Sequence, residues 1–134
     1  MLLVANSFGY AKSNKLINKF AWPVKGKIIS YYGDIVDNIV NKGIDIYVSA
    51  ETPVIAANSG KIKFCRELKG YGKTIIIDHK YGWSSVYSNL NIIYTKEGKY
   101  VKKNSTIGKT NSNSYLHFEI RKDGISQNPL KYLN

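Results

Sequence analysis

The chain has 134 residues, of which 43% are hydrophobic and 22% charged, so it is long enough to form one domain with its own core. No apolar run approaches the roughly 18 residues of a membrane-spanning helix. The formal net charge is +11, and the only cysteine, Cys65, excludes an intrachain disulfide.

The first nineteen residues differ in character from the rest. Residues 1–5 are apolar, but they are too few for the signal-peptide core of about 7–15 residues, and they lack a basic segment. Serine, asparagine and lysine dominate the stretch that follows. We expect residues 1–19 to be a polar lead-in, either the remnant of a leader or an ordinary chain start, and residues 20–133 to form the domain.

Short strands separated by turns account for the remaining chain. Alternating or continuous apolar runs predict strands over 27–33, 43–48, 54–57, 60–64, 74–79, 84–90 and 115–121, with shorter ones within 91–110. The turn Asn58-Ser59-Gly60 predicts a hairpin between its flanking strands. Residues 34–42 predict a loop, with Ile35, Val36, Ile39 and Val40 folded beneath it. Because no ten-residue stretch has a helical period, the sequence predicts an all-β fold, a compact antiparallel sheet or sandwich.

Two of these strands display polar groups that suit a metal site. In 43–48 the core-facing positions are Ile44, Ile46 and Val48, and in 115–121 they are Leu116, Phe118 and Ile120. This alternation leaves Asp45, Tyr115 and His117 on the open faces. A carboxylate and an imidazole could share a metal there, with Asn41 standing where a third ligand would be.

The high positive charge allows two explanations. Eighteen of the twenty basic residues are lysine, which favours attraction to a polyanion such as nucleic acid, anionic lipid or an acidic wall polymer. The alternative is a genome rich in A, since lysine and asparagine codons are A-rich. The lysines are scattered along the sequence rather than clustered, so neither explanation is preferred.

An ordered series of motifs resembles the lysostaphin-type (LytM-like) zinc endopeptidase domain. The match covers about residues 20–133 and comprises Trp22-Pro23-Val24, Gly43-Ile44-Asp45, Thr52-Pro53-Val54, Asp78-His79, Ile107-Gly108, Leu116-His117-Phe118-Glu119-Ile120 and Asn128-Pro129. The resemblance implies an antiparallel β domain with an open groove floored by the sheet. Active members use zinc to hydrolyse peptide cross-links of bacterial peptidoglycan.

The family's functional residues are only partly kept. By this resemblance Asp45 and His117 match two zinc ligands, whereas Asn41 stands at the third. Asn89 and Tyr115 stand where the family has two helper histidines. An amide is a poor substitute for imidazole on zinc, and asparagine cannot exchange a proton near neutral pH. We therefore expect no catalytic residue and no bound cofactor, with zinc only if the site is residually functional.

Three smaller expectations concern single side chains. Cys65 lies in a strand-like run and is expected to pack in or beside the core. His79 matches a family position that is not a zinc ligand and is expected to form structural hydrogen bonds. Aromatic residues could line the groove, and the binding candidates are Tyr71, Tyr87, Asn89 and Tyr115.

The resemblance favours a non-catalytic module of the bacterial cell envelope, in the periplasm or otherwise outside the cytoplasm. It would bind peptidoglycan or a partner such as a cell-wall hydrolase or division protein, and so regulate wall hydrolysis or cell division. The alternative is a weak metallopeptidase that uses Asp45, His117 and Asn41. Nucleic acid is not expected as a partner, because charge alone supports it and no motif does.

Overall fold

The computed structural model describes residues 20–134, and the predicted lead-in over 1–19 lies outside the described residues. The described part is built almost entirely from short strands, as predicted. In chain order they are β1 (Lys27–Ser30), β2 (Ile35–Val36), β3 (Ile39–Val40), β4 (Ile44–Val48), β5 (Pro53–Ile55), β6 (Gly60–Leu68), β7 (Gly72–Lys80), β8 (Trp83–Leu90), β9 (Ile92–Ile93), β10 (Tyr100–Val101), β11 (Thr106–Lys109), β12 (Ser114–Lys122) and β13 (Ile125–Gln127). A 3-10 helix, η1 (Pro129–Lys131), follows. Among residues 20–134 no helix is long and apolar enough to cross a membrane.

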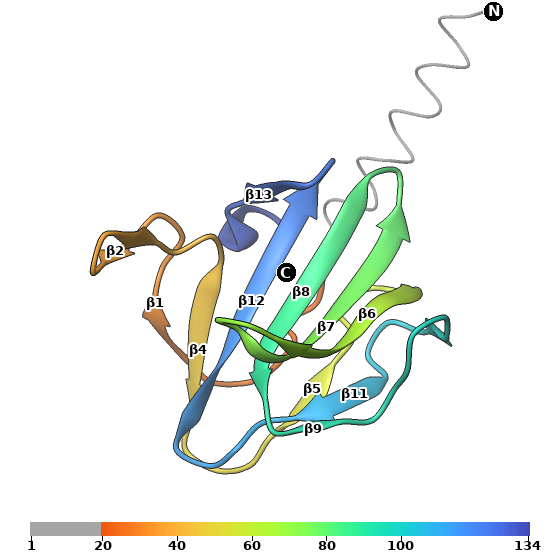
Figure 1. The fold of residues 1–134 in the computed structure, drawn as a ribbon, viewed down its shortest axis with the longest axis horizontal. Helices are drawn as coiled ribbons and strands as arrows, with labels where there is room; N and C mark the ends of the chain where they lie inside the picture. The colour runs from red at the N-terminus through yellow and green to blue at the C-terminus, as the bar shows by residue number, and fades with distance from the viewer. Residues whose placement is uncertain (1–19) are drawn as a thin grey trace, which may run out of the picture.

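The strands form one large sheet, one small sheet and a separate hairpin (Figure 1). The large sheet has the order β1-β4-β12-β8-β7-β6-β10, with β13 also paired to β12. The small sheet has the order β5-β11-β9, and β2 pairs only with β3. All pairs between these strands are antiparallel, which confirms the predicted fold class.

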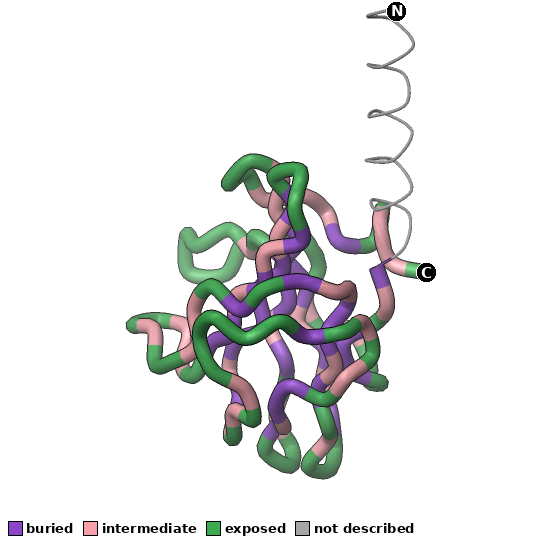
Figure 2. Tube along the Cα trace, turned by 90° about the vertical axis from the view of Figure 1, so that its right-hand side faces the viewer, coloured by how far each residue is buried: buried purple, intermediate pink, exposed green. Residues whose placement is uncertain are grey.

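The core lies between the large sheet and the small sheet, and Figure 2 shows its buried segments surrounded by exposed loops. The predicted inward positions of β4 and β12 are all buried: Ile44, Ile46, Val48, Leu116, Phe118 and Ile120. Gly43 immediately precedes β4 and lies directly against the backbone of β12. A Cβ at this position would lie 2.1 Å from the Phe118 carbonyl oxygen. Only glycine allows this approach, which brings β4 against β12.

The loop predicted over 34–42 is wrong in one respect: its apolar residues do not fold beneath it. They form the β2–β3 hairpin, in which Ile35, Val36, Ile39 and Val40 are 67%, 66%, 72% and 49% exposed. Asp37 and Asn38 have φ of 53° and 64°, the positive values that a type I′ turn requires. This tight turn projects the hairpin away from the sheet (Figure 1).

The hairpin predicted around residues 58–60 is also wrong. β5 pairs with β11 in the small sheet, whereas β6 pairs with β7 and β10 in the large sheet. The turn therefore carries the chain from one sheet to the other. Local turn residues could not reveal this, because the partner strands lie far away in the sequence.

A buried polar chain fixes the position of His79, as predicted. Its Nδ1 lies 2.7 Å from the Ser59 carbonyl oxygen, which only accepts, so Nδ1 carries the proton. Nε2 then accepts from the Ser85 hydroxyl at 2.7 Å, and Ser85 accepts in turn from Tyr87. Burial lowers the pKa of His79 to about 4, against the raising effects of Ser59 and Asp78, so the ring is neutral at pH 7.

Cys65 packs at the edge of the core, as predicted, and its thiol donates to the Thr95 carbonyl oxygen at 3.3 Å. Burial, followed by the charge of Glu97, raises the pKa of this thiol. The thiolate, which is the nucleophilic form of cysteine, is therefore disfavoured.

Candidate functional site

A groove of about 510 Å³ runs across the face of the large sheet that points away from the core. The β2–β3 hairpin forms one wall, strands β4, β12 and β8 form the floor, and the β6–β7 turn forms the other wall (Figure 1). Its lining includes Asp34, Val36, Asp37, Ile39 and Val40 on the hairpin side, Asp45, Ser88, His117 and Glu119 on the floor, and Gly70, Tyr71, Asn89 and Tyr115 opposite.

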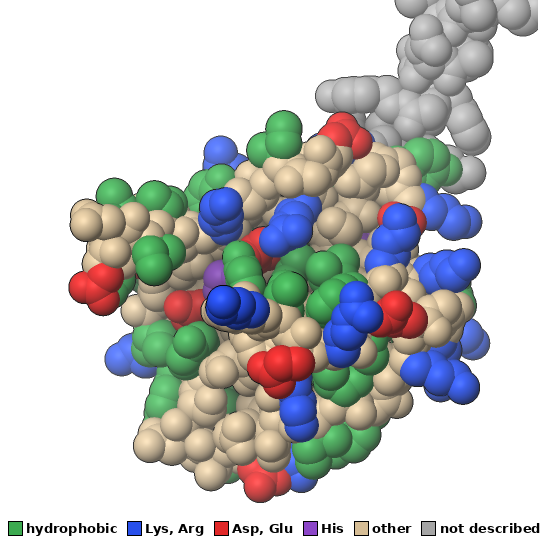
Figure 3. Space-filling view, in the orientation of Figure 1, with side chains coloured by type: hydrophobic (Ala, Val, Ile, Leu, Met, Phe, Trp, Pro, Cys, Tyr) green, Lys and Arg blue, Asp and Glu red, His purple; other side chains and the backbone are tan. Residues whose placement is uncertain are grey.

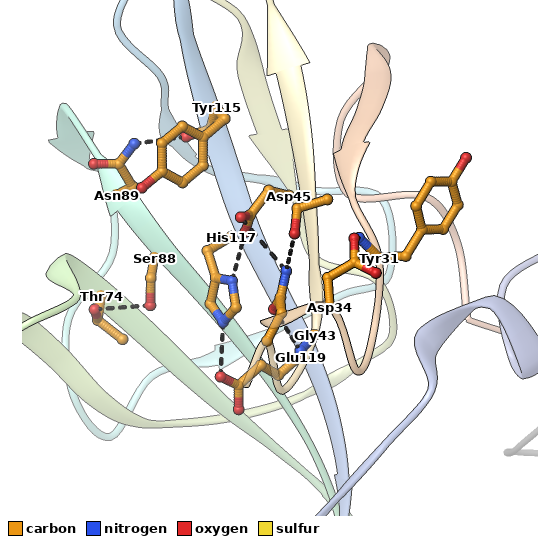
Figure 4. Close-up of polar contacts among 12 residues, drawn as sticks. Tyr31, Asp34, Gly43, Asp45, Thr74, Ser88, Asn89, Tyr115, His117 and Glu119 are labelled. Carbon is orange, nitrogen blue, oxygen red and sulfur yellow. Dashed lines mark hydrogen bonds and ion pairs between the residues drawn. The ribbon is translucent and has the colours of Figure 1, made fainter. Parts of the chain in front are cut away.

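The groove floor brings Asp45 and His117 together, as the sequence predicts. The two residues are cross-strand partners in the β4–β12 register. His117 Nδ1 lies 2.7 Å from the Asp45 carboxylate, and Nε2 lies 2.7 Å from the Glu119 carboxylate (Figure 4). Glu119 is fully buried and also accepts from the Arg121 guanidinium at 2.7–2.8 Å. The result is a line of alternating charges: Asp45, His117, Glu119, Arg121.

This arrangement makes His117 a cation. A carboxylate at neutral pH only accepts hydrogen bonds, so both ring nitrogens must carry protons. Burial by itself would lower the pKa of His117, but the hydrogen bonds and charges of Asp45 and Glu119 outweigh burial and raise it to about 9. For Glu119 burial alone would raise the pKa, and the contacts with His117 and Arg121 lower it instead. The groove floor therefore holds an imidazolium at pH 7.

Tyr71 packs beside this imidazolium, with the two rings tilted by 56°. Its ring centroid lies 5.8 Å from that of His117, within the range of a cation–π contact. The backbone around Tyr71 is held to β8, because its carbonyl accepts from the Asn89 N–H at 2.9 Å. Tyr71 is thus a groove residue, as predicted.

Asn41 stands beside the pair but has both ends of its amide engaged. Its oxygen accepts from the Gly43 N–H at 2.9 Å. Its nitrogen donates to the Ser30 hydroxyl at 2.9 Å and lies 3.5 Å from the Asp45 carboxylate. Asn41 therefore shapes the turn that enters β4 and presents N–H protons to Asp45 rather than a lone pair to a metal.

Asn89 and Tyr115, the positions of the two helper histidines by resemblance, lie together on the far wall. Asn89 has a φ of 65°, a left-handed conformation that asparagine tolerates better than most residues. Its amide nitrogen donates to the Tyr115 carbonyl oxygen at 2.8 Å, joining β8 to β12. The Tyr115 side chain is 39% exposed and contributes to the wall of the groove.

Tyr87 is not a groove residue, contrary to the prediction. Its side chain is fully buried, its ring packs against Phe118 with centroids 5.4 Å apart, and its hydroxyl accepts from the Ala57 N–H at 2.9 Å. Desolvation of this hydroxyl raises its pKa. Side chains of β8 alternate between the two faces of the sheet, so Tyr87 points toward the core and the next residue, Ser88, points toward the groove.

The donors, as they are placed, do not fit zinc. Zinc requires a neutral imidazole with a free lone pair, whereas both nitrogens of His117 donate to carboxylates. The Asn41 amide nitrogen has no lone pair to offer, and its oxygen is already bonded to Gly43. Among residues 20–134 no group of three histidine, cysteine or acidic side chains is arranged to hold a metal. A protonated imidazole supplies the positive charge between these carboxylates.

Sequence reasoning missed Glu119, Arg121 and Ser30. The alternation of β12 contained the signal for the first two, because residues 117, 119 and 121 share one face of a strand. A fully buried carboxylate needs partners, and Glu119 has two, His117 and Arg121, which only the fold brings to it. Ser30 carried no signal, since its contact with Asn41 depends on the β1–β4 pairing.

Known proteins resemble this chain in sequence. Residues 39–129 match the model of peptidase family M23. Murein hydrolase activator NlpD of Escherichia coli is 39% identical over 122 residues, which cover 87% of this chain and 32% of that protein. The lipoprotein NlpD/LppB homolog of Pseudomonas aeruginosa is 34% identical over 122 residues, which cover 87% of this chain and 40% of that protein. The chain thus spans roughly a third of the length of these relatives.

Solved structures share the fold. The SpoIIQ–SpoIIIAH pore-forming complex contains a chain that superposes with a TM-score of 0.76 at 26% identity, covering 88% of this chain and 92% of that one. Lysostaphin from Staphylococcus simulans superposes with a TM-score of 0.70 at 24% identity, covering 86% and 52% of the two chains, and supports the fold alone. The match of the family model over residues 39–129, with relatives at 34–39% identity, shows that this chain belongs to peptidase family M23.

Proposed function

We propose that this chain is a non-catalytic regulator of cell-wall hydrolysis, which binds a segment of a partner protein in its groove. One observation carries the proposal: His117 lies between Asp45 and Glu119, with a carboxylate oxygen 2.7 Å from each ring nitrogen. A hydrolytic zinc site needs three protein ligands and an open position for water. The donor set supports binding rather than hydrolysis.

The helper positions on the groove wall are also unsuited to proton transfer. Asn89 has no titratable group, and its amide already bonds the Tyr115 backbone. The neutral histidine of the chain, His79, belongs to the buried chain that includes Ser85 and Tyr87. Neither side chain can act as a general base toward a substrate in the groove.

The β2–β3 hairpin supports a role in binding. Its four apolar side chains are 49–72% exposed, and three of them, Val36, Ile39 and Val40, line the groove. Asp34 precedes them and Asp37 lies in the turn between them, and residues 33–40 contain no lysine or arginine although the chain carries +11. An exposed apolar projection beside a groove is typical of a protein interface. A partner segment with apolar and basic side chains would complement it.

The relatives supply the cellular context. One is named a murein hydrolase activator and another a lipoprotein. By analogy, this chain belongs to the cell envelope outside the cytoplasm, and its partner is a cell-wall hydrolase. Binding of peptidoglycan itself in the groove is the second possibility, drawn from the family resemblance.

The test is a hydrolase assay with dye-labelled peptidoglycan. The purified chain alone should release no dye and no new amino termini, whereas adding it to a cell-wall amidase from the same organism should increase dye release. Val36→Asp and Ile39→Asp should abolish the increase. Ile125→Asp is the matched control, because Ile125 is 67% exposed, close to Val36 at 66% and Ile39 at 72%, but does not line the groove.

Other outcomes separate the alternatives. Zinc-dependent release of amino termini by the chain alone would establish the metallopeptidase and overturn the proposal. Stimulation that survives both hairpin substitutions would place the partner surface elsewhere. Sedimentation with insoluble peptidoglycan that Tyr71→Ala weakens, without stimulation of the amidase, would favour the wall as the ligand.

A further inference from the structure

The lysines that look scattered in the sequence gather at one end of the large sheet. β10 pairs with the beginning of β6, and Tyr100 lies opposite Lys61. The segment before β10 follows β6 as well, since the Ile62 N–H donates to the Lys99 carbonyl oxygen at 2.8 Å and the Gly98 N–H donates back to Ile62 at 2.9 Å. These contacts assemble a surface that we name the basic edge: Lys61, Lys63, Lys96, Lys99 and Lys102.

The basic edge is exposed and incompletely neutralised. All five lysines are exposed, and none of them forms an ion pair with another residue of the part that the structure describes. Two carboxylates lie near: Asp78, the register partner of Lys61 on β7, and Glu97 in the loop before β10. Five positive charges against two negative charges leave a surplus of three. Figure 3 shows the basic side chains on the right-hand side, over the beginning of β6 and the adjoining loop.

The groove has the opposite character. Its lining contains four acidic residues, Asp34, Asp37, Asp45 and Glu119, against two cations, Lys42 and His117. In the sheet order, β8, β7 and β6 separate the groove strand β12 from β10. At about 4.8 Å between neighbouring strands, β12 on the groove floor lies roughly 20 Å from β10. The groove wall at Gly70 and Tyr71 follows the end of β6, whereas Lys61 and Lys63 lie at its beginning. A partner on the basic edge would therefore leave the groove open.

The chemistry of the basic edge indicates its partner. Lysine is a compact, hydrated point charge, which suits a diffuse layer of anions better than a defined bidentate site. Tyr100 stands among the lysines at 60% exposure, and tyrosine favours the boundary between apolar and aqueous phases. A single-stranded polyanion is instead held in a basic groove with several stacking rings, whereas the groove of this chain is acidic.

We propose that the basic edge docks this chain on an anionic phospholipid surface while the groove remains free for its partner. The inference rests on the envelope location of the proposed function, but not on binding in the groove. Each lysine near such a surface contributes a screened attraction, and several together give reversible attachment. Docking would hold the groove at a fixed orientation beside the membrane.

The experiment is co-sedimentation of the purified chain with vesicles of phosphatidylcholine containing about 30% phosphatidylglycerol, at about 0.15 M salt. The variant Lys61→Glu/Lys63→Glu/Lys99→Glu is compared with Lys25→Glu/Lys27→Glu/Lys131→Glu, which changes the net charge equally at exposed positions outside the basic edge. The basic-edge variant should bind about a hundredfold more weakly than the parent, and the control only a fewfold more weakly. Thermal melting of both variants establishes that they fold.

Equal weakening in the two variants would show that net charge alone is responsible and overturn the proposal. Absence of binding to the anionic vesicles would overturn it too, as would a soluble polyphosphate binding the chain when vesicles do not. Stimulation of the amidase in solution, without vesicles, should be unchanged in the basic-edge variant. A failure of docking is thereby distinguished from a failure of the proposed function.

Discussion

Raising the pH above 9 should destabilise this protein by removing the proton that His117 shares with its two carboxylates. The pKa of His117 is about 9 in the folded chain, against an ordinary value of 6.5. At about 1.4 kcal/mol for each tenfold change, this difference corresponds to about 3 kcal/mol. Because the folded value is the higher one, the stabilisation is complete below pH 6.5 and is lost as the pH rises through 9.

The assay is urea unfolding of the metal-free chain and of His117→Gln at pH 6 and pH 10. The free energy of unfolding of the parent should exceed that of the variant at pH 6, and this difference should shrink by about 3 kcal/mol at pH 10. Titration of lysines and tyrosines affects both proteins and cancels in the comparison. Glu119→Gln should lower the pKa of His117, since one of its two carboxylates is gone.

NMR provides the direct check. The chain has two histidines, and their imidazole signals should titrate at widely separated values, near 9 for His117 and near 4 for His79. If both rings titrate between 6 and 7, the imidazolium between Asp45 and Glu119 does not exist and the incompatibility with zinc loses its basis. Stoichiometric zinc that suppresses the titration of His117 would have the same consequence.

The remaining predictions test other parts of the fold and site. His79 should have the opposite pH dependence, because its pKa is lower in the folded chain: its contribution to stability is complete above pH 6.5 and is lost as the pH falls toward 4. In urea unfolding, the free energy of unfolding of the parent should exceed that of His79→Asn by up to about 3 kcal/mol less at pH 4 than at pH 7. Gly43→Ala should lower the free energy of unfolding by about 3 kcal/mol, since its Cβ would lie 2.1 Å from the Phe118 oxygen, and an unchanged urea midpoint would contradict this. Metal analysis should find well below one zinc per chain in the parent. The triple variant Asn41→His, Asn89→His and Tyr115→His restores the three family histidines and should bind more zinc. No gain in zinc would refute the residue correspondence.

Periodicity predicted much of the fold. The strict alternation of β4 and β12 fixed which side chains enter the core and which face outward, because a strand has a side-chain period of two. The same rule placed Asp45 and His117 on one surface. It failed for residues 34–40, where four apolar residues in a short segment suggested burial. The I′ turn at Asp37-Asn38 instead exposes them, so these four apolar side chains stand outside the core.

The amino-acid sequence is sufficient for the fold class and the family resemblance, and from that resemblance it predicts that Asn41, Asn89 and Tyr115 stand at the positions of the family's third zinc ligand and helper histidines. The tertiary structure alone decided the state of His117, because its charge depends on two carboxylates, of which Asp45 is 72 residues away along the chain. It also decided the burial of Tyr87 and the distribution of charge. Lysines scattered over residues 61–102 become neighbours only when β10 pairs with β6, since strand pairing between distant segments cannot be inferred from local composition.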